Sequence, residues 1–439
     1  MTEAMPLIFF GTVLVFLMLG FPVAFTLGGV SAFFGLATMG LNFFNLLPLR
    51  IWGVMSNYIL IAVPLFVFMG VMLEKSGLAE SLLETMALLF GRLRGGLAIS
   101  VVVVGAMLAA STGIVGATVV TMGLLSLPTM LKRGYSPELA TGTIAASGTL
   151  GQIIPPSIVL VLLGSILNVS VGDMFMGAVI PGIVLVGLYL LWIVITSILN
   201  PESAPAMPEK ELAQFKGKKM YVQILRAFIL PFFLVFAVLG SIFAGIASPT
   251  EAAAVGAFGA TLLTIFQGKM TLQTLKDVMR ETTHLTSMVF IILVGATAFS
   301  LVFRGMHGDR YLTELILGAN LSPHLFLALV MVVIFVAGFF IDFIEITFII
   351  VPIVAPIFVA MGVDLLWVGI LIAVNLQTSF LTPPFGFALF YLKGVAPPEI
   401  KTSHIYKGII PFIVIQLVAL GLIVAVPETV TWFPEWILK

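Results

Sequence analysis

The stretch GQIIPPS at residues 151–157 and the stretch LTPPFGF at residues 381–387 decide how this chain is organised. Each holds a proline doublet inside an apolar segment, and an ungapped shift of 228 residues superposes Pro155-Pro156 on Pro383-Pro384. Four further identities follow the same shift: Pro128 with Pro356, Gly134 with Gly362, Ile144 with Ile372, and Ala145 with Ala373. The chain is therefore built from two related halves.

Both doublets follow runs of uncharged polar residues, SGTLGQ at 147–152 and NLQTS at 375–379. Proline cannot donate a backbone hydrogen bond, and it disfavours helical geometry at the residue before it. Each helix should open just before its doublet and restart there, with proline at the first helical position. This pattern is typical of broken membrane helices.

Composition sets the class of protein. Of the 439 residues, 60% are hydrophobic and 9% are charged, which is too few charges to cover a water-soluble domain. The net charge is zero, so no basic face is available for nucleic acid, and the absence of cysteine excludes thiolate chemistry. Residues 1–20 lack a basic start and a cleavage site, so we expect a permanent first span and not a signal peptide.

A membrane-crossing helix needs about 20 apolar residues. Ten runs meet or approach this length, near 6–20, 22–39, 57–73, 136–168, 175–199, 221–246, 249–267, 285–303, 365–392 and 408–427. The amphipathic segments 77–94 and 271–283 are expected to lie along the cytoplasmic interface. Two longer regions, 95–131 and 321–362, are interrupted near their middles.

Flanking charges indicate what the first of these regions is. Arg92 and Arg94 precede it, and Lys132 and Arg133 follow it, so by the positive-inside rule both flanks are cytoplasmic. Its small, polar centre at 110–117 then predicts a re-entrant hairpin whose tip is buried in protein. Two ordinary spans joined outside remain an alternative, although 37 residues would leave almost no loop.

The second region has no Lys or Arg between Arg310 and Lys393, so its flanks should face outward. The two halves are therefore predicted to be inverted, with both chain termini periplasmic. Arg304 and Arg310 fall on the outer side of this arrangement, against the rule. We predict an all-α polytopic membrane protein with two inverted repeats, each containing a re-entrant hairpin and a broken helix.

The predicted domains follow from these boundaries. The first repeat covers 1–200, with a scaffold at 1–94 and a hairpin and broken helix at 95–200. A cytoplasmic linker covers 201–220. The second repeat covers 221–439, with a scaffold at 221–304 and a hairpin and broken helix at 321–427.

Each helix break, together with the hairpin tip expected to face it, is called a centre here, the first in the first half and the second in the second half. The unwound backbone at each centre supplies its chemistry. Free carbonyls suit a small hard cation and free amides at a helix start suit an anion, and inside a membrane both are tolerated only where they line a protein cavity. We expect residues 147–157 to face the first hairpin tip, 111–117, and residues 375–385 to face the second, 339–347. Each pair offers hydroxyl, amide and main-chain oxygens for one cation site.

Structural roles compete with these functional ones. A proline doublet often only kinks a helix, and buried Ser or Thr often bonds back to its own helix. Asp342 and Glu345 differ, because carboxylates inside an apolar run need a partner, a proton or a cation. Glu251 begins a span after Pro249, where a carboxylate favourably meets the helix dipole. An intramembrane enzyme that uses Asp342 and Glu345 as a pair is the alternative from another class.

At these residues the chain resembles the large membrane subunit, DctM type, of tripartite ATP-independent periplasmic (TRAP) transporters. The resemblance covers essentially the whole chain. It rests on four motifs: STG at 111–113, GQIIPPS at 151–157, SPTEAAAVG at 248–256 and TPPFG at 382–386. It implies a sodium-driven elevator importer, not an enzyme, in a bacterial inner membrane, with sodium as coupling ion and no cofactor.

The resemblance also implies where ions and substrate bind. The first sodium site falls on Ser111, Thr112, Gly113, Ala117, Ser147, Gly148, Thr149 and Pro155. The second falls on Asp342, Glu345, Thr347, Asn375, Thr378, Ser379 and Thr382. Substrate contacts are expected from Gly151, Gln152, Ser157, Gln377 and Gly386.

Partners and substrate class follow from the same resemblance. An organic acid, such as a C4-dicarboxylate, a keto acid or sialic acid, would be delivered by a periplasmic binding protein. A small four-helix membrane subunit would be a separate chain. The alternative is a free-standing sodium–organic anion symporter. Neither centre holds Arg or Lys, so the sequence does not identify the acid.

Overall fold

The computed structural model describes residues 4–112, 115–212, 218–384 and 386–437, and within these ranges the regular structure is all helical, without strands. The first half contains α1 (Met5–Met18), α2 (Val23–Met39), α3 (Leu47–Met55), α4 (Ala62–Lys75), α5 (Leu78–Phe90), α6 (Gly96–Thr112), α7 (Val115–Lys132), α8 (Pro137–Thr149), α9 (Ile158–Leu167) and α10 (Val171–Leu199). The short helices η1 (Leu41–Leu46), η2 (Tyr58–Ile61), η3 (Leu150–Gln152) and η4 (Pro201–Ser203) connect them.

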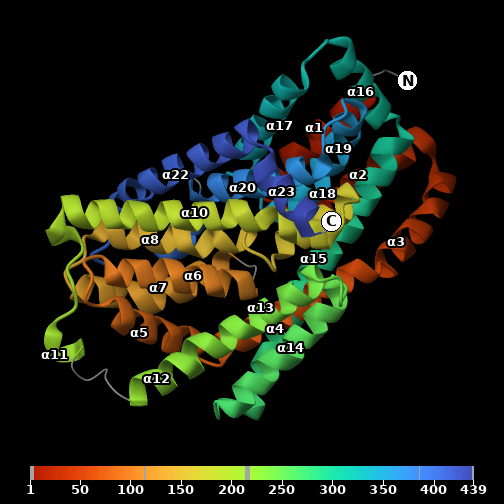
Figure 1. Cartoon of the computed structure of the whole chain (residues 1–439). Helices are drawn as coiled ribbons and strands as arrows, with labels where there is room; N and C mark the ends of the chain where they lie inside the picture. The colour runs from red at the N-terminus through yellow and green to blue at the C-terminus, as the bar shows by residue number, and fades with distance from the viewer. Residues whose placement is uncertain (1–3, 113–114, 213–217, 385, 438–439) are drawn as a thin grey trace.

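The second half follows the short α11 (Glu209–Leu212) (Figure 1). It contains α12 (Lys218–Ile224), a π-helical turn η5 (Leu225–Ile229), α13 (Leu230–Phe243), α14 (Pro249–Phe266), α15 (Leu272–Gly305), α16 (Gly308–Gly318), α17 (Pro323–Ala337), α18 (Phe343–Ile349), α19 (Val351–Ala360), α20 (Leu365–Leu381), α21 (Phe387–Val395), α22 (Thr402–Ala425) and α23 (Glu428–Ile437).

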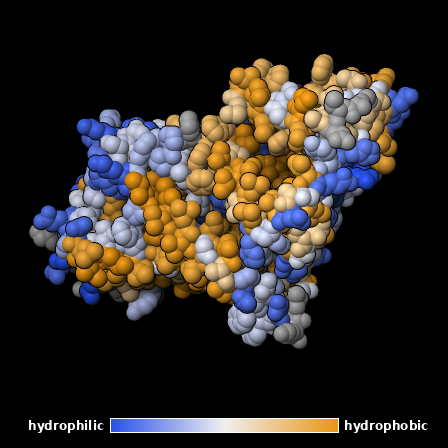
Figure 2. Space-filling view, turned by 90° about the horizontal axis from the view of Figure 1, so that it is seen from above, coloured by the Kyte–Doolittle hydropathy of each residue, from blue (hydrophilic) through white to orange (hydrophobic). Residues whose placement is uncertain are grey.

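Seven helices in the described ranges are long and apolar enough to cross a membrane, or eight if the bent pair α18–α19 counts as one span. The sequence predicts about ten. Two of the expected spans, α1 and α2, are only 14 and 17 residues long, and two others are the broken pairs α8–α9 and α20–α21. Hydrophobic side chains cover the middle of the molecule, and hydrophilic ones gather at its two ends (Figure 2).

Helices of one half pack on helices of the other half, and the repeat relates these pairs to one another. In the peripheral group, which comprises α1–α4 and α13–α15, α4 packs on α14 and α2 packs on α15. In the central group, which comprises α6–α10 and α17–α22, α8 packs on α22 and α10 packs on α20. Such crossed pairs are what an inverted duplication produces, and they confirm the predicted pair of inverted repeats.

Both predicted hairpins are present. Helices α6 and α7 lie side by side, joined at Gly113 and Ile114, which lie outside the described residues. In the second half α17 ends at Ala337, and the returning arm begins at Phe343 and bends by 49° between α18 and α19. Each hairpin packs on the broken helix of its own half, α6 and α7 on α8, and α17 on α20.

The broken helices open where the sequence predicts, but the prediction that proline restarts them is wrong. Helix α8 ends at Thr149, yet α9 begins only at Ile158, after the extended residue Ser157. Helix α20 ends at Leu381, and α21 begins at Phe387. The second proline of each doublet pushes the first out of helical geometry, so both doublets lie in the unwound segments. Both Pro-Pro peptide bonds are cis.

The segment 271–283 is also not a separate interfacial helix. It is the first part of α15, which runs unbroken for 34 residues. Neither Gly nor Pro occurs in residues 272–294, where the amphipathic segment joins the apolar one, and a helix of 34 residues extends to about 50 Å, well beyond the hydrocarbon thickness. The corresponding segment of the first half does form its own helix, α5, because Gly77 with a φ of 69° separates it from α4.

Candidate ion and substrate site

The two broken helices touch at their breaks. Gln377 Nε2 of α20 donates a hydrogen bond to Thr149 Oγ1 at the end of α8, over 3.3 Å, and both side chains are fully buried. These residues are 228 apart, so they occupy the same position in the two halves. Equivalent positions of an inverted repeat meet only at its pseudo-twofold axis. The sequence-predicted centres are therefore neighbours at the middle of the central group.

A second buried contact repeats this relation. Gln416 Nε2 of α22 donates to the Tyr189 hydroxyl of α10 over 2.6 Å, and these residues are 227 apart. Tyr189 also lies beside Gln377. Thr149, Gln377, Tyr189 and Gln416 thus form one polar junction along the axis, and each is fully buried.

The described residues of the first centre are mostly buried. Ser147, Thr149 and Pro155 are buried, and a Cβ on Gly148 would contact the Val119 backbone of α7 at 3.1 Å. A Cβ on Gly105 of α6 would lie 2.6 Å from Ser147 Cβ. Both arms of the first hairpin therefore press on this segment, as expected for residues that share one site.

Hydroxyl groups of the first centre keep free lone pairs. Ser147 Oγ donates to the Ile144 carbonyl over 3.1 Å, and Thr149 Oγ1 donates to the Ala146 carbonyl over 2.9 Å. A hydroxyl that donates its proton still has two lone pairs, and Thr149 Oγ1 keeps one of them after it accepts from Gln377, so back-bonding does not exclude coordination of a cation.

Three buried glutamine amides are left without enough partners, and one of them is Gln416, whose Oε1 has none. Gln152 is fully buried, and neither its Nε2 nor its Oε1 has a hydrogen-bond partner. Gln377 Oε1 likewise has none. Buried polar groups without partners are costly and rare, so they mark a place where a polar ligand or water is expected.

The restarting helices present open N-termini. Ser157 precedes α9 but its Oγ donates to the Gln152 carbonyl over 2.9 Å and makes no cap to α9. Gly386, which precedes α21, has no side chain to cap it. First-turn amides without a side-chain cap suit a negatively charged group.

The second centre contains the same kind of polar groups. Asn375 Nδ2 donates to the Met331 carbonyl of α17 over 2.7 Å, and a Cβ on Gly338 would overlap Ser379. The hydroxyls of Thr378, Ser379 and Thr382 each donate to a carbonyl of their own helix over 2.8 Å. The end of α17 thus packs on the predicted second sodium site.

The carboxylates lie at the returning arm of the second hairpin. Asp342 caps α18, since its Oδ1 accepts from the Phe343 amide over 2.7 Å. Glu345 is 9% exposed, and its Oε2 has no partner; Thr347 Oγ1, fully buried, also has none. Both carboxylates lie within electrostatic range of Tyr391 on α21. Tyr391 in turn covers Gly116 of the first hairpin, where a Cβ would lie 3.0 Å from its ring.

Several predicted residues remain without a described environment. Gly113 lies outside the described residues, and the side chains of Ser111 and Thr112 are not described, although both residues belong to α6. Ala117 is half-buried on α7. Gly151 is buried next to Gln152. Within the described ranges, no group of three or more His, Asp or Glu could hold a transition metal.

Sequence reasoning missed Tyr189, Gln416 and Tyr391. Only the 227-residue spacing of Tyr189 and Gln416 could have indicated that they meet, because both are polar at one position of the repeat. Glu251 takes the structural role that was expected. Its Oε2 accepts from the Ser248 amide over 2.8 Å in a capping box at the start of α14.

Comparison with known proteins agrees with this architecture. The C4-dicarboxylate TRAP transporter large permease protein DctM of Vibrio cholerae is 32% identical, over 96% of this chain and 96% of its own length. The sialic acid TRAP transporter large permease protein SiaM of the same species is 28% identical, over 95% and 96%. The crystal structure of the Alcanivorax borkumensis YdaH transporter, described as having an unusual topology, matches with a TM-score of 0.66 at 15% identity.

That structural likeness covers 98% of this chain and 99% of the other, and it shows the fold. The family model of the tripartite ATP-independent periplasmic transporter, DctM component, matches residues 10–429. The chain therefore belongs to the DctM family, the large membrane component of tripartite ATP-independent periplasmic transporters.

Proposed function

We propose that this chain is the permease subunit of a sodium-coupled importer of organic acids in a bacterial inner membrane. The observation that carries the proposal is the buried junction at the pseudo-twofold axis, where Gln377 and Gln416 each have an unpartnered amide oxygen. Gln152, three residues beyond Thr149, has a wholly unpartnered amide, and the helix start that follows each break is uncapped. Amides and helix starts suit a carboxylate, and the neighbouring hydroxyl, amide and carboxylate oxygens suit sodium.

The relatives support the substrate class. The names of several relatives specify C4-dicarboxylates, sialic acid and ectoine, which carry a carboxylate group, and another names isethionate, whose acidic group is a sulfonate. The same names support a tripartite system, so the chain would receive its acid from a periplasmic binding protein and work with a small membrane subunit. A free-standing symporter remains the second candidate, and uptake by vesicles that contain this chain alone would favour it.

We propose that transport moves the central group, as a transport domain, against the peripheral group, as a scaffold. Two described side-chain hydrogen bonds link the groups, one near each end of α4. Asn57 Nδ2 donates to Ser165 Oγ over 3.2 Å, and Thr121 Oγ1 donates to Glu74 Oε1 over 2.8 Å. The remaining contacts of α4 with α6 and α9 are mostly between apolar helices, and such an interface can slide at little cost.

The orientation is part of the proposal. With both termini in the periplasm, cysteines at Lys132 and Lys216 should react with impermeant reagents from the cytoplasm, and cysteines at Asn320 and Asp364 from the periplasm. The chain has no native cysteine to interfere. Reaction of Asn320 and Asp364 from opposite sides would contradict the inverted arrangement.

A reconstitution experiment tests the function. Proteoliposomes with the chain, its small subunit and its binding protein should accumulate labelled acid when sodium is outside, and potassium should not replace sodium. ATP inside or outside should have no effect. Equal uptake in sodium and potassium would reject the coupling.

Gln152→Leu sharpens this test. Leucine removes an amide that has no partner in the fold, so the melting temperature should hold or rise, while uptake should fall at least about a hundredfold. Gln416→Leu is the comparison, because it breaks the hydrogen bond from Gln416 Nε2 to the Tyr189 hydroxyl in the buried junction and should lower the melting temperature. Unchanged uptake in Gln152→Leu would show that the residue does not contact substrate.

A further inference from the structure

The two centres hold no Lys or Arg, yet an importer of acids needs somewhere to select a negative charge. A cavity of about 760 Å³ lies between the peripheral group, at α3 and α15, and the central group, at α9, α18 and α19. It opens at the predicted periplasmic end, because α3 and the end of α15 lie there. Its volume suits a small organic acid together with some water.

Two arginines line this cavity, Arg50 of α3 and Arg304 of α15. Both are exposed, and neither forms an ion pair with a described residue. No Asp or Glu occurs among the described residues of the lining. Basic residues at the outer end run against the positive-inside rule, so neither topology nor ion pairing accounts for these two side chains.

Uncharged polar groups complete the cavity wall. The Asn57–Ser165 hydrogen bond crosses it from the peripheral to the central group, and Ser300 lies four residues before Arg304 on α15. Phe348 and Pro352 also line the cavity, and they belong to the returning arm of the second hairpin. The cavity therefore adjoins the element that carries Asp342 and Glu345.

We propose that this cavity is an outer reception site for the carboxylate of the substrate, held by Arg50 and Arg304 before the acid reaches the buried junction. The site rests on the proposed function and adds anion selection to it. Guanidinium groups bind carboxylates in a bidentate manner, and a cavity with low-dielectric walls concentrates ions of the opposite charge. Because the two arginines come from the peripheral group, the acid must leave them to move with the central group.

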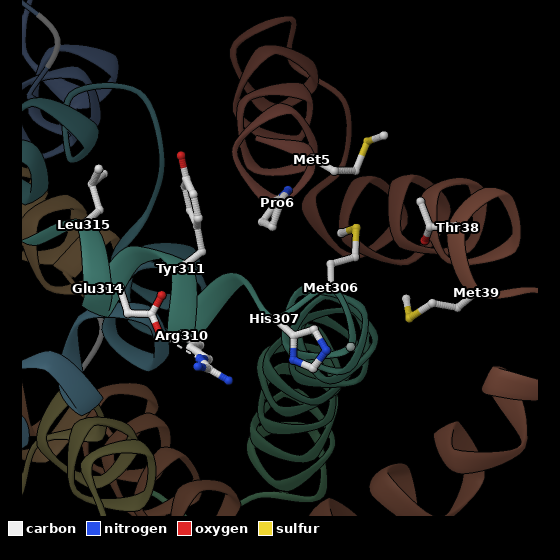
Figure 3. A pocket seen from close by; sticks show the side chains of 11 residues that line it. Met5, Pro6, Thr38, Met39, Met306, His307, Arg310, Tyr311, Glu314 and Leu315 are labelled. Atoms are coloured by element: carbon white, nitrogen blue, oxygen red, sulfur yellow. Dashed lines mark hydrogen bonds and ion pairs between the residues drawn. The ribbon is translucent and has the colours of Figure 1, made fainter. Parts of the chain in front are cut away.

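A neighbouring cavity supplies the control. Figure 3 shows Arg310 and Glu314 of α16 in a separate cavity of about 640 Å³, which Met5, Pro6 and His307 also line. Arg310 Nε lies 2.7 Å from Glu314 Oε1, so this arginine is already paired. It lies at the same end of the molecule and is also exposed, but it does not line the proposed site.

Chemical modification tests the site without requiring transport. In Ser300→Cys, the anionic reagent MTSES and the cationic reagent MTSET would be compared in nanodiscs of phosphatidylcholine. Adding Arg50→Gln and Arg304→Gln should lower the MTSES to MTSET rate ratio about tenfold, since two nearby positive charges act oppositely on the two reagents. Adding Arg310→Gln instead should leave the ratio within about twofold.

Ligand protection gives the second measurement. Succinate and N-acetylneuraminate would be tested against succinamide, which has no charge, and the carboxylates should slow the labelling of Ser300→Cys only when both arginines are present. An unchanged rate ratio, or equal protection by succinamide, would overturn the proposal. The proposal would also be overturned if labelling of Ser300→Cys were slowed in phosphatidylglycerol nanodiscs but by neither carboxylate. The cavity would then hold a lipid headgroup.

Transport gives a third readout. Arg50→Gln and Arg304→Gln should each raise the KM for uptake at least about fivefold and leave the maximal rate within twofold, while Arg310→Gln should change neither. If wild-type uptake does not depend on sodium, the proposed function fails while the labelling result still decides whether the cavity selects anions.

Discussion

In the first half Pro155 and Pro156 are both buried, whereas in the second half Pro384 is exposed and its carbonyl accepts a hydrogen bond from the Tyr406 hydroxyl over 3.0 Å. The first hairpin carries no charge near its tip, whereas the second carries Asp342 and Glu345. One backbone plan has therefore been kept in both halves while burial and charge have diverged. The difference predicts that the first centre is a neutral site with little access to water and that the second is a charged site with more access to water.

The largest expected effect is on stability, where one glycine of each broken helix can be compared. A Cβ on Gly142 of α8 would overlap the Gly408 carbonyl of α22, which is rigid backbone. A Cβ on Gly369 of α20 would meet only the ends of Leu167 and Met174, at 2.9 Å. Gly142→Ala should therefore destabilise the protein by about 3 kcal/mol or prevent folding, and Gly369→Ala by less than about 1 kcal/mol.

Thermal unfolding in detergent checks this prediction. Gly187→Ala on α10 is the control, because nothing lies within 4 Å of its added Cβ, and alanine favours a helix. Similar melting temperatures for Gly142→Ala and Gly369→Ala would show that the two halves pack with equal tolerance.

The charge difference predicts an effect on sodium. Asp342→Asn should raise the sodium concentration for half-maximal uptake about tenfold, because a carboxylate neutralises a cation and an amide does not. The melting temperature should change by only a few degrees. An unchanged sodium dependence would make Asp342 structural, and the second site would then rest on Asn375, Thr378, Ser379 and main-chain oxygens.

The difference in burial predicts unequal access. Pro384→Cys should react with a water-soluble maleimide from the cytoplasmic side. Pro384 is hydrogen-bonded to Tyr406, and the residues near Tyr406 in the sequence are polar: Lys401, His404 and Lys407. Ser157→Cys, which is fully buried beside the first doublet, should react at least about tenfold more slowly. Comparable rates would show that the first centre also opens to water in the ensemble.

The smallest effect is expected away from both centres. Glu251→Gln weakens the capping box of α14 in the peripheral group and should lower the melting temperature slightly, with no change in sodium dependence. The reverse pattern, in which sodium dependence shifts at constant stability, would place Glu251 in the ion site and not at a helix cap.

Local signals account for what the sequence predicts well. The proline doublets, the polar runs before them and the flanking charges act within a few residues, and they locate both breaks and both hairpins. These local signals do not predict contacts between residues of different halves. Thr149 meets Gln377, and Arg50 shares a cavity with Arg304, only because the two halves pack around one axis.

Other misses have different physical causes. The restart positions after Pro156 and Pro384 depend on two consecutive prolines acting together, and the single-residue preference of proline for a helix start does not describe them. The sequence does not predict that α15 is one continuous helix, because its amphipathic part and its apolar part read as separate elements. No helix-breaking residue separates the two parts at 283–285.

The dependence of uptake on sodium concentration tests the central claim most directly, namely that two sodium sites flank one junction at the axis. In reconstituted tripartite vesicles the wild-type curve should be sigmoidal, with a Hill coefficient near two. Ser147→Ala in the first centre and Asp342→Asn in the second should each reduce it toward one. A hyperbolic wild-type curve, or a coefficient that neither variant changes, would contradict the account.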